Sequence, residues 1–145
     1  MKKASSGRRR IIIPRPAPDR QFRAFKVSKR FDEDISAVLG AFQLGLVGRH
    51  VIFARIAFGG MAGTPSRAPL AEMVAIGIDL DDPATWAKAL AELGNDFTPI
   101  DDARASAAYR SLIARNLFLK TLMEISGIPA DITRLSSLEA SHAAE

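Results

Sequence analysis

The chain has 145 residues, of which 48% are hydrophobic and 25% charged, and it contains no cysteine. This length suits one globular domain that buries roughly two thirds of its unfolded surface. The lack of cysteine excludes disulfides, zinc–thiolate sites and any iron–sulfur cluster held by this polypeptide.

The sequence also indicates where the protein works. No apolar run approaches the roughly 20 residues that cross a bilayer, and the chain does not open with the pattern of a signal peptide. The absence of cysteine fits a reducing compartment. We therefore expect a cytoplasmic protein with no membrane contact.

The net charge of +4 conceals a strong asymmetry along the chain. Residues 1–30 hold 11 of the 20 lysines and arginines and one acid, so they carry +10, whereas the remainder carries −6. A basic arm can bind phosphates, nucleic acid or an acidic partner, and it can equally be a solvated, disordered start. The body gives no support for base recognition, because it has one Trp, one Tyr and no helix with a basic stripe. We expect a basic disordered arm over residues 1–10.

The first half of the chain is predicted to form strands. Residues 8–13 suit a short strand that the following prolines end, and residues 21–28 suit a second. Residues 35–46 alternate more clearly, residues 47–50 predict a hairpin turn, and residues 51–58 predict the return strand. The side chains that share one face of the 35–46 strand are Val38, Phe42, Leu44 and Leu46.

Helices are predicted to follow. The first begins after Pro69 and ends at Gly77. Its helically spaced apolar residues are Leu70, Met73 and Val74. The second begins at Asp82, an N-cap followed by proline, and ends at Gly94. Its expected buried residues are Trp86, Leu90 and Leu93.

The third predicted helix is the longest. Asp102 is expected to cap it, and Gly127-Ile128-Pro129 to end it. Its predicted apolar face includes Tyr109, Leu112, Ile113 and Leu117. The residues expected mostly on the other side are Arg110, Ser111, Arg115 and Glu124. Residues 131–138 suit a last short turn, so residues 127–145 form a C-terminal turn and tail.

Strands followed by helices are typical of an α+β fold and not of alternating βαβ units. We therefore predict, for residues 11–126, an antiparallel sheet of three to four strands packed against about three helices. The glycines at positions 59, 60 and 63 match no phosphate-binding motif, so we interpret them as a structural corner after the last strand. His50 and His142 have no partners at metal-ligand spacing, and we predict no metal site and no catalytic residue.

The charged stretch that follows the 21–28 strand is the strongest candidate for a binding site. A lysine at a strand end, here Lys26, can meet a phosphate or a flavin carbonyl as a point charge. The charged residues after it are Lys29, Arg30, Asp32, Glu33 and Asp34. The alternative interpretation is a surface loop of ion pairs with little energetic value.

Four segments of the chain form an ordered set of motifs: Ile13-Pro14-Arg15-Pro16, Phe25-Lys-Val-Ser-Lys-Arg-Phe-Asp-Glu-Asp-Ile-Ser-Ala-Val-Leu-Gly-Ala-Phe42, Ala57-Phe-Gly-Gly-Met-Ala-Gly-Thr-Pro65 and Asp102-Ala-Arg-Ala-Ser-Ala-Ala-Tyr-Arg110. Together they resemble the C-terminal part of the FAD domain in the small subunit of bacterial xanthine dehydrogenase, a molybdenum hydroxylase. They also resemble the CO dehydrogenase flavoprotein. The resemblance runs from Ile13 to about Met123.

The resemblance implies a flavin site. In xanthine dehydrogenases the lysine that corresponds to Lys26 contacts FAD, and the charged loop after it lies where the nicotinamide cofactor approaches. By this resemblance Lys26 binds FAD, while Lys29, Arg30 and the acids from Asp32 to Asp34 form its neighbourhood. The chain would complete the flavin pocket of a xanthine dehydrogenase-like enzyme, in which electrons pass from purine hydroxylation through FAD to NAD.

The resemblance also implies partners. Only ten residues precede Ile11, where the family has 2Fe–2S clusters and the loops that hold the FAD pyrophosphate. We therefore expect FAD to be shared with missing N-terminal FAD subdomains. Molybdopterin and 2Fe–2S clusters would lie on other parts of the complex, and the isolated chain would be inactive. Two alternatives stay open: an assembly or protein-binding module derived from this domain but without flavin, and nucleic-acid binding through the basic arm.

Overall fold

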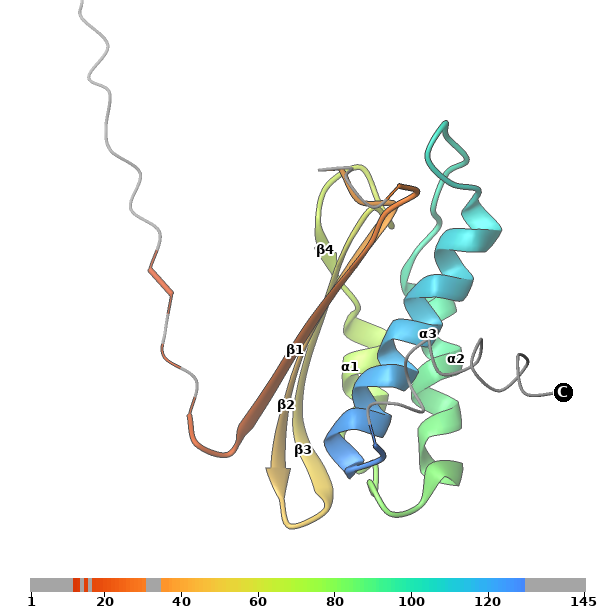
Figure 1. The fold of residues 1–145 in the computed structure, drawn as a ribbon. Coiled ribbons are helices and arrows are strands. Elements are labelled where there is room, and N and C mark those ends of the chain that lie inside the picture. Colours follow the sequence, from red (N-terminus) through yellow and green to blue (C-terminus); the bar gives the residue numbers. More distant parts are fainter. Residues whose placement is uncertain (1–11, 14, 16, 31–34, 130–145) are drawn as a thin grey trace, which may run out of the picture.

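The computed structural model describes residues 12, 13, 15, 17–30 and 35–129 (Figure 1). The elements, in chain order, are strands β1 (Arg20–Val27), β2 (Val38–Val47), β3 (His50–Gly59) and β4 (Ser66–Arg67), helix α1 (Pro69–Ala75), the 3₁₀ turn η1 (Pro83–Thr85), and helices α2 (Trp86–Asp96) and α3 (Ala107–Ser126). The predicted α+β fold is confirmed.

The four strands form one antiparallel sheet in the order β1-β2-β3-β4, so β1 is an edge strand. A tight turn joins β2 to β3, as the sequence predicts, and Gly48 adopts a φ of 58° there. Most strand boundaries lie within one residue of the prediction, but two differences are larger. β2 begins at Val38 and not at residue 35, and the two described residues of the predicted 8–13 strand, Ile12 and Ile13, belong to no strand.

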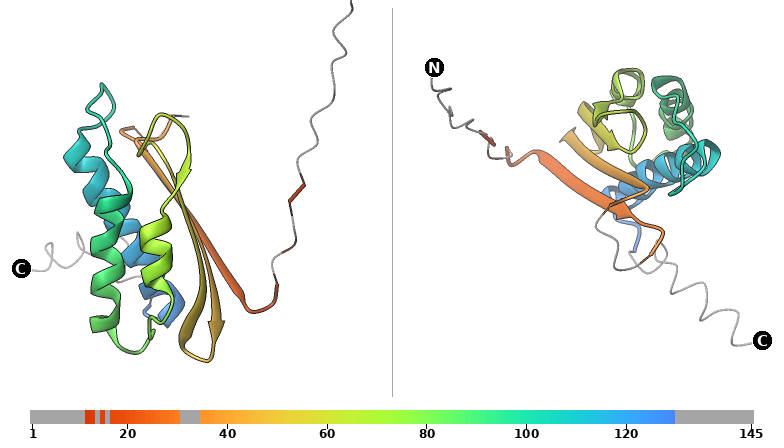
Figure 2. Two further views of the ribbon diagram at one scale, coloured as in Figure 1. Left: turned by 180° about the vertical axis from the view of Figure 1, so that it is seen from behind. Right: turned by 90° about the horizontal axis from the view of Figure 1, so that it is seen from above.

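The helices α1, α2 and α3 all lie on one side of the sheet (Figures 1 and 2). Helix α1 packs on β3 and helix α3 on β2, while α2 lies against α1 and α3. Phe42 of β2 is fully buried at the centre of this layer. Its ring meets Phe58 edge-on at 5.4 Å and stacks on Phe118 of α3 at 5.7 Å. The core therefore joins the two central strands to the longest helix.

The opposite face of the sheet, called the outer face here, is not covered by any described helix or strand. Because successive side chains of a strand point to opposite faces, residues paired across the strands share it. Ala24, Ala41, Ala57 and Arg67 are opposite one another from β1 to β4. This row of the outer face thus has three alanines, with Arg67 at its β4 end.

The predicted face of α1 is wrong. The buried residues of this helix are Ala71, Glu72 and Ala75, whereas Met73 is 65% exposed. The reason is that alanines let α1 approach β3 closely, and that Glu72 accepts a 2.8 Å hydrogen bond from the backbone N–H of Ile56. A buried carboxylate that satisfies a strand N–H decides the orientation of this helix over its apolar residues.

The predicted face of α2 is confirmed, since Trp86, Leu90 and Leu93 are buried. Asp82 caps the 3₁₀ turn that precedes this helix by accepting from Ala84 N. The helix passes the predicted end at Gly94 and stops at Asp96. The carboxylate of Asp96 accepts the N–H groups of Leu70 and Ala71, and so it caps helix α1 from a neighbouring element.

Helix α3 differs most from its prediction. It begins at Ala107 with Ser106 as N-cap, and not at Asp102, while Gly127 ends it as predicted with a φ of 95°. Tyr109 and Leu112, predicted on the buried face, are 44% and 53% exposed. The buried residues are Arg110, Ala114, Leu117, Phe118, Thr121 and Leu122. Apolar residues occur all round this helix, so their spacing does not single out one face.

Candidate functional site

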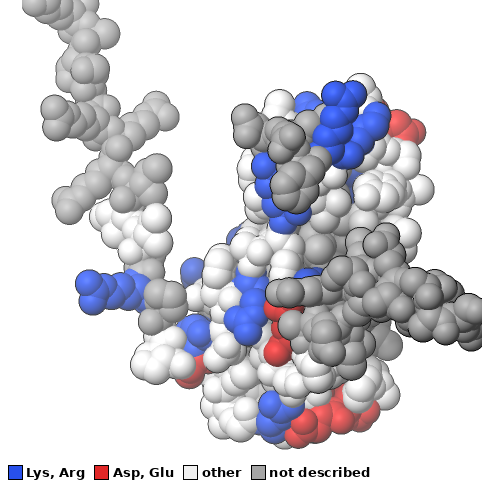
Figure 3. Space-filling model, viewed as in Figure 1, with Lys and Arg blue, Asp and Glu red and all other residues white. Residues whose placement is uncertain are grey.

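The site predicted from Lys26 lies at the end of the sheet where β1 ends and β2 begins. Exposed basic residues gather at this end: Lys26, Lys29, Arg30 and Arg104. In Figure 3 Lys and Arg side chains cluster at this upper end of the molecule, near the start of α3. Asp and Glu are more frequent at the opposite end in the same view. The four basic side chains named above are therefore exposed at this end of the molecule.

The sheet itself positions Lys26. It is the last residue but one of β1 and lies on the outer face, where it is paired with Leu39 of β2. Leu39 is in turn paired with Gly59 of β3. An ammonium group thus stands beside a leucine and a glycine at the end of a rigid sheet, an arrangement that can present a point charge to a flat ligand.

A hollow of about 380 Å³ lies next to this row. It is lined by Ile35, Ser36, Leu39, Ala41, Ala57, Phe58, Gly59, Gly60, Pro65 and Arg104. Most of these side chains are small or apolar, and the guanidinium of Arg104 supplies the positive charge. The hollow brings together three segments that are far apart in sequence: the start of β2, the glycine corner after β3, and the loop before α3.

The glycine corner has the structural role that the sequence predicts. Gly60 adopts a φ of 85°, a conformation that residues with a side chain rarely take. A Cβ atom at this position would lie 2.2 Å from the carbonyl oxygen of Ala37. The corner therefore lets the β3 end pass directly against the end of the charged loop.

Asp102 organises the loop before α3 instead of capping the helix. Its Oδ1 accepts hydrogen bonds from Arg104 N at 2.8 Å, Ala105 N at 3.0 Å and the guanidinium of Arg110 at 2.7 Å. The N–H groups of Ala105 and Arg104, together with the Arg110 guanidinium, lower the pKa of Asp102 to about 2. The carboxylate therefore stays ionised at neutral pH and fixes the backbone of Arg104 beside the hollow.

The structure brings together part of the predicted neighbourhood. Lys29 Nζ donates to the carbonyl of Ala103 at 3.4 Å, so the loop after β1 contacts the loop before α3. Arg30 is exposed at the same end. Asp32, Glu33 and Asp34 lie outside the described residues.

Comparison with known proteins identifies the fold. The family described as CO dehydrogenase flavoprotein C-terminal domain matches residues 23–125, which is more than half of the chain. The chain belongs to this family. The predicted recognition of a molybdenum hydroxylase flavoprotein domain is confirmed at this level.

Solved structures agree with this flavoprotein family. CO dehydrogenase from Oligotropha carboxidovorans has a TM-score of 0.70 and 25% identity, covering 81% of this chain and 40% of its own. CO dehydrogenase from Hydrogenophaga pseudoflava, with 23% identity and a TM-score of 0.65, covers 72% of this chain and 36% of its own. Quinoline 2-oxidoreductase from Pseudomonas putida 86 has 22% identity and a TM-score of 0.65, with 77% and 38% covered. These last two show the fold alone.

The chain therefore spans between 36% and 40% of the length of these solved chains. A search of curated protein sequences finds no match. The family assignment thus rests on the match over residues 23–125 and on the shared fold.

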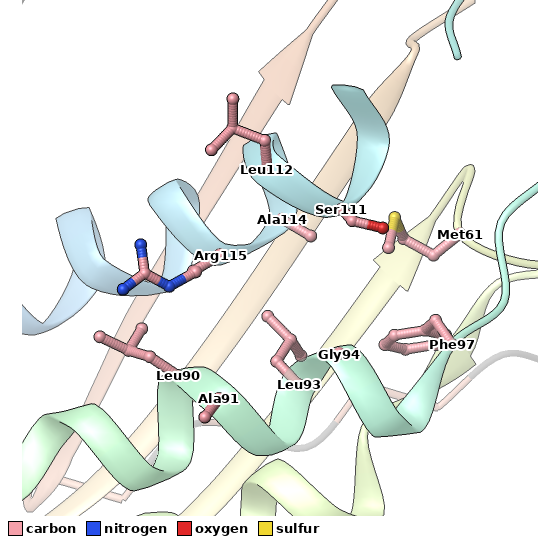
Figure 4. A pocket seen from close by; sticks show the side chains of 10 residues that line it. All are labelled: Met61, Leu90, Ala91, Leu93, Gly94, Phe97, Ser111, Leu112, Ala114 and Arg115. Carbon is pink, nitrogen blue, oxygen red and sulfur yellow. The ribbon is translucent and has the colours of Figure 1, made fainter. Parts of the chain in front are cut away.

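Two other hollows of this flavoprotein domain lie outside the predicted site, and the wider one is lined by Arg15, Arg20, Arg55 and Arg67. A groove of about 260 Å³ between α2 and α3 is mostly apolar, and its polar side chains are Ser111 and Arg115 (Figure 4). A wider hollow of about 610 Å³ lies on the outer face, where Arg20 stacks over the ring of Phe53 at 3.6 Å. Within the described ranges, no three His, Asp or Glu side chains are placed to hold a metal ion. No described helix is long and apolar enough to span a membrane.

Sequence reasoning missed the residues that complete the site. Arg104 lines the hollow beside the predicted glycine corner, and Arg110, which was expected on the outer side of the third helix, contacts its walls. The family motif from Asp102 to Arg110 was a signal that this loop matters. It did not indicate that the loop lies beside the β1–β2 connection.

The charge on Asp102 predicts an acid sensitivity of this loop. Because the folded pKa of about 2 lies below the ordinary 3.8, the stabilisation is complete above about pH 4 and is lost as the pH falls towards 2. We expect Asp102→Asn to lower the thermal midpoint at pH 7, and the difference from the parent to shrink as the pH falls to 2. Thermal unfolding followed by circular dichroism checks this. An equal difference at both pH values would contradict it.

Proposed function

We propose that this chain completes the FAD pocket of a molybdenum hydroxylase. The observation that carries the proposal is the position of Lys26, which stands on the outer face at the sheet end, beside the hollow of about 380 Å³. Membership of a flavoprotein family supports it. FAD, when bound, supplies the two-electron redox chemistry.

The residues present fit a flavin. The outer face beside Lys26 bears Leu39, Ala41, Ala57 and Gly59, whose small or apolar side chains allow a flat ring to approach the backbone. Lys26 would hold the polar edge of the ring by a charge-assisted hydrogen bond, and its fixed charge favours negative charge that develops there. The sheet fixes the backbone that carries Lys26, so the face on which this charge stands is set before the ligand arrives.

The finer assignment is a xanthine dehydrogenase-like enzyme that oxidises purines with NAD as electron acceptor. The support is the resemblance of the charged stretch after Lys26, and the basic surface formed by Lys29, Arg30 and Arg104. A positive surface at the flavin edge attracts a phosphate-bearing acceptor such as NAD. The pathway and the purine substrate are part of the same proposal.

The proposed partners are the remaining segments of the FAD domain, an iron–sulfur segment and a molybdopterin-binding subunit. The support is that the chain covers 40% of the CO dehydrogenase chain that it resembles, and that one solved relative is described as Cu,Mo-CO dehydrogenase. With these partners, the outer face would be one wall of a pocket closed from the other side.

We expect the chain alone to fold but to bind FAD weakly or not at all. Its sequence contains no glycine-rich phosphate loop, whose backbone N–H groups would supply most of the pyrophosphate binding. Titration of FAD followed by flavin fluorescence measures this. Tight stoichiometric binding by the purified chain would contradict the expectation. Failure to take up FAD even beside the other segments of the FAD domain would favour the assembly module without flavin.

Lys26→Ala tests the flavin site in an enzyme assembled from this chain and its partners. We expect the fold and the molybdenum half-reaction to be intact, but flavin retention to weaken or reduction of NAD to slow, because one amine at a strand end contributes charge and not packing. FAD content and rates of NAD reduction are the measurements. Lys88→Ala, on the exposed side of α2, is the matched control. Normal FAD content and normal NAD reduction in the Lys26 variant would remove the flavin assignment.

A further inference from the structure

Arg110 is the most unusual residue near the hollow. Its side chain is 2% exposed, although arginine is rarely buried completely. It projects from the first turn of α3 towards the sheet end, where its guanidinium meets three segments of the chain. A buried charge of this kind is costly unless its hydrogen bonds are satisfied, so the contacts that it makes are informative.

The guanidinium of Arg110 holds the three segments that frame the hollow. Nη1 donates to the carbonyl of Ala37, at the end of the charged loop, and to the carbonyl of Gly60 at 2.8 Å. Nη2 donates to Asp102 at 2.7 Å, and Asp102 fixes the backbone of Arg104. Each contacted residue either lines the hollow or lies within two residues of one that does.

One of these contacts leads directly to Lys26. The N–H of Ala37 donates to the carbonyl of Val27 at 2.8 Å, which joins the residue before β2 to the end of β1. Val27 follows Lys26 in the same strand. Arg110 therefore holds Ala37 through its carbonyl oxygen. Ala37 in turn holds the end of β1, the strand that bears Lys26.

The chemistry of the contact requires arginine. Two carbonyls and a carboxylate lie in different directions around one planar fork of donors, which a lysine ammonium does not reproduce. Arginine at this position therefore reaches all three acceptors with one guanidinium.

We propose that Arg110 is the positioning residue of the site: its guanidinium sets the spacing between the charged loop, the glycine corner and the Arg104 loop. This proposal rests on the proposed function where it treats the hollow as the flavin-facing site. Its test uses the unliganded chain, so the failure of either proposal is distinguishable from the failure of the other.

Gly60 offers a second way to disturb the same junction. A Cβ atom there would lie 2.9 Å from Arg110 Nη1 and 2.2 Å from the Ala37 oxygen. Gly60→Ala therefore pushes apart the two partners that Arg110 joins without removing the guanidinium. Gly60→Ala disturbs this contact by steric displacement, whereas a substitution of Arg110 removes its hydrogen-bond donor.

The experiment is hydrogen exchange of the full chain, followed by mass spectrometry of peptides. In Arg110→Met we expect exchange to rise by about tenfold or more in peptides that cover residues 35–41, 58–64 and 102–107, the scale of losing a buried, charge-assisted hydrogen bond. Peptides from the β2–β3 turn and from α2 should be unchanged. Arg110→Lys should give a partial effect in the same peptides, and Gly60→Ala should loosen the first two regions.

Arg115→Met, an exposed arginine on the same helix, is the matched control and should leave all three regions unchanged. If Arg110→Met does not fold, Asp102→Asn serves in its place and should loosen residues 102–107 selectively. A uniform rise across all peptides in the folded variants would show a general role in stability and would overturn the proposal. Unchanged exchange in the three regions would overturn it as well.

Discussion

Phe42→Ala is expected to lower the free energy of unfolding by about 3–5 kcal/mol. Phe42 is fully buried and meets rings from three elements: Phe25 of β1 at 6.4 Å, Phe58 of β3 at 5.4 Å and Phe118 of α3 at 5.7 Å. Truncation would leave a cavity at the junction of the sheet and the long helix, where a rigid sheet cannot collapse to fill it. Urea unfolding followed by circular dichroism measures the change.

Phe22→Ala is the matched control for this substitution. Phe22 is in β1 on the outer face and is 54% exposed, so the same truncation removes far less buried surface. We expect it to cost less than about 1 kcal/mol in the isolated chain. Equal urea midpoints for the two variants would show that the helices do not cover the face assigned to them.

Leu122→Ala is expected to destabilise the chain by about 2–5 kcal/mol. Leu122 is fully buried on α3 and belongs to the same core cluster as Phe42. Its position on the helix follows Phe118 by one turn, so both side chains point into the same layer. The loss should appear as a lower urea midpoint with an unchanged slope, because the unfolded state exposes the same surface.

Leu112→Ala, on the same helix, is the control that distinguishes the observed face from the predicted one. The sequence predicted Leu112 to be buried, but it is 53% exposed at the rim of the groove between α2 and α3. We expect a change within about 1 kcal/mol. If Leu112→Ala proved as damaging as Leu122→Ala, the orientation of α3 would be different from that described.

The sheet was predictable because its evidence is local. Alternation in β2 and β3, with a short turn between them, fixes the pairing and the face of Phe42 without knowledge of other elements. The faces of α1 and α3 were not predictable in this way. They are decided by Glu72, which satisfies the Ile56 N–H, and by Arg110, which contacts three distant segments. Polar contacts between distant residues leave no periodic signal in the sequence.

The candidate site likewise has one part that the sequence predicts and one part that it does not. Lys26 was predicted because a strand end and a family motif both point to it, and its role in binding stays a prediction; it lies on the outer face in the row that includes Leu39 and Gly59. Arg104 was missed because its position depends on Asp102. This residue was interpreted as a helix cap, but its carboxylate instead accepts hydrogen bonds from the backbone N–H groups of Arg104 and Ala105. A carboxylate before a helix has several backbone N–H groups within reach, and local sequence does not choose among them.

The edge position of β1 has a consequence for how this chain avoids binding to itself. No other described strand pairs with the free side of β1, so its backbone could template intermolecular strand addition. Arg20 and Lys26 place positive charges at the two ends of that strand on the outer face, whereas Arg23 is ion-paired with Glu124 on the helix side at 3.2 Å. Two identical edges brought together would place these charges side by side, and their repulsion opposes aggregation. The lysine proposed to serve the flavin therefore also contributes to keeping this edge from pairing with a second copy.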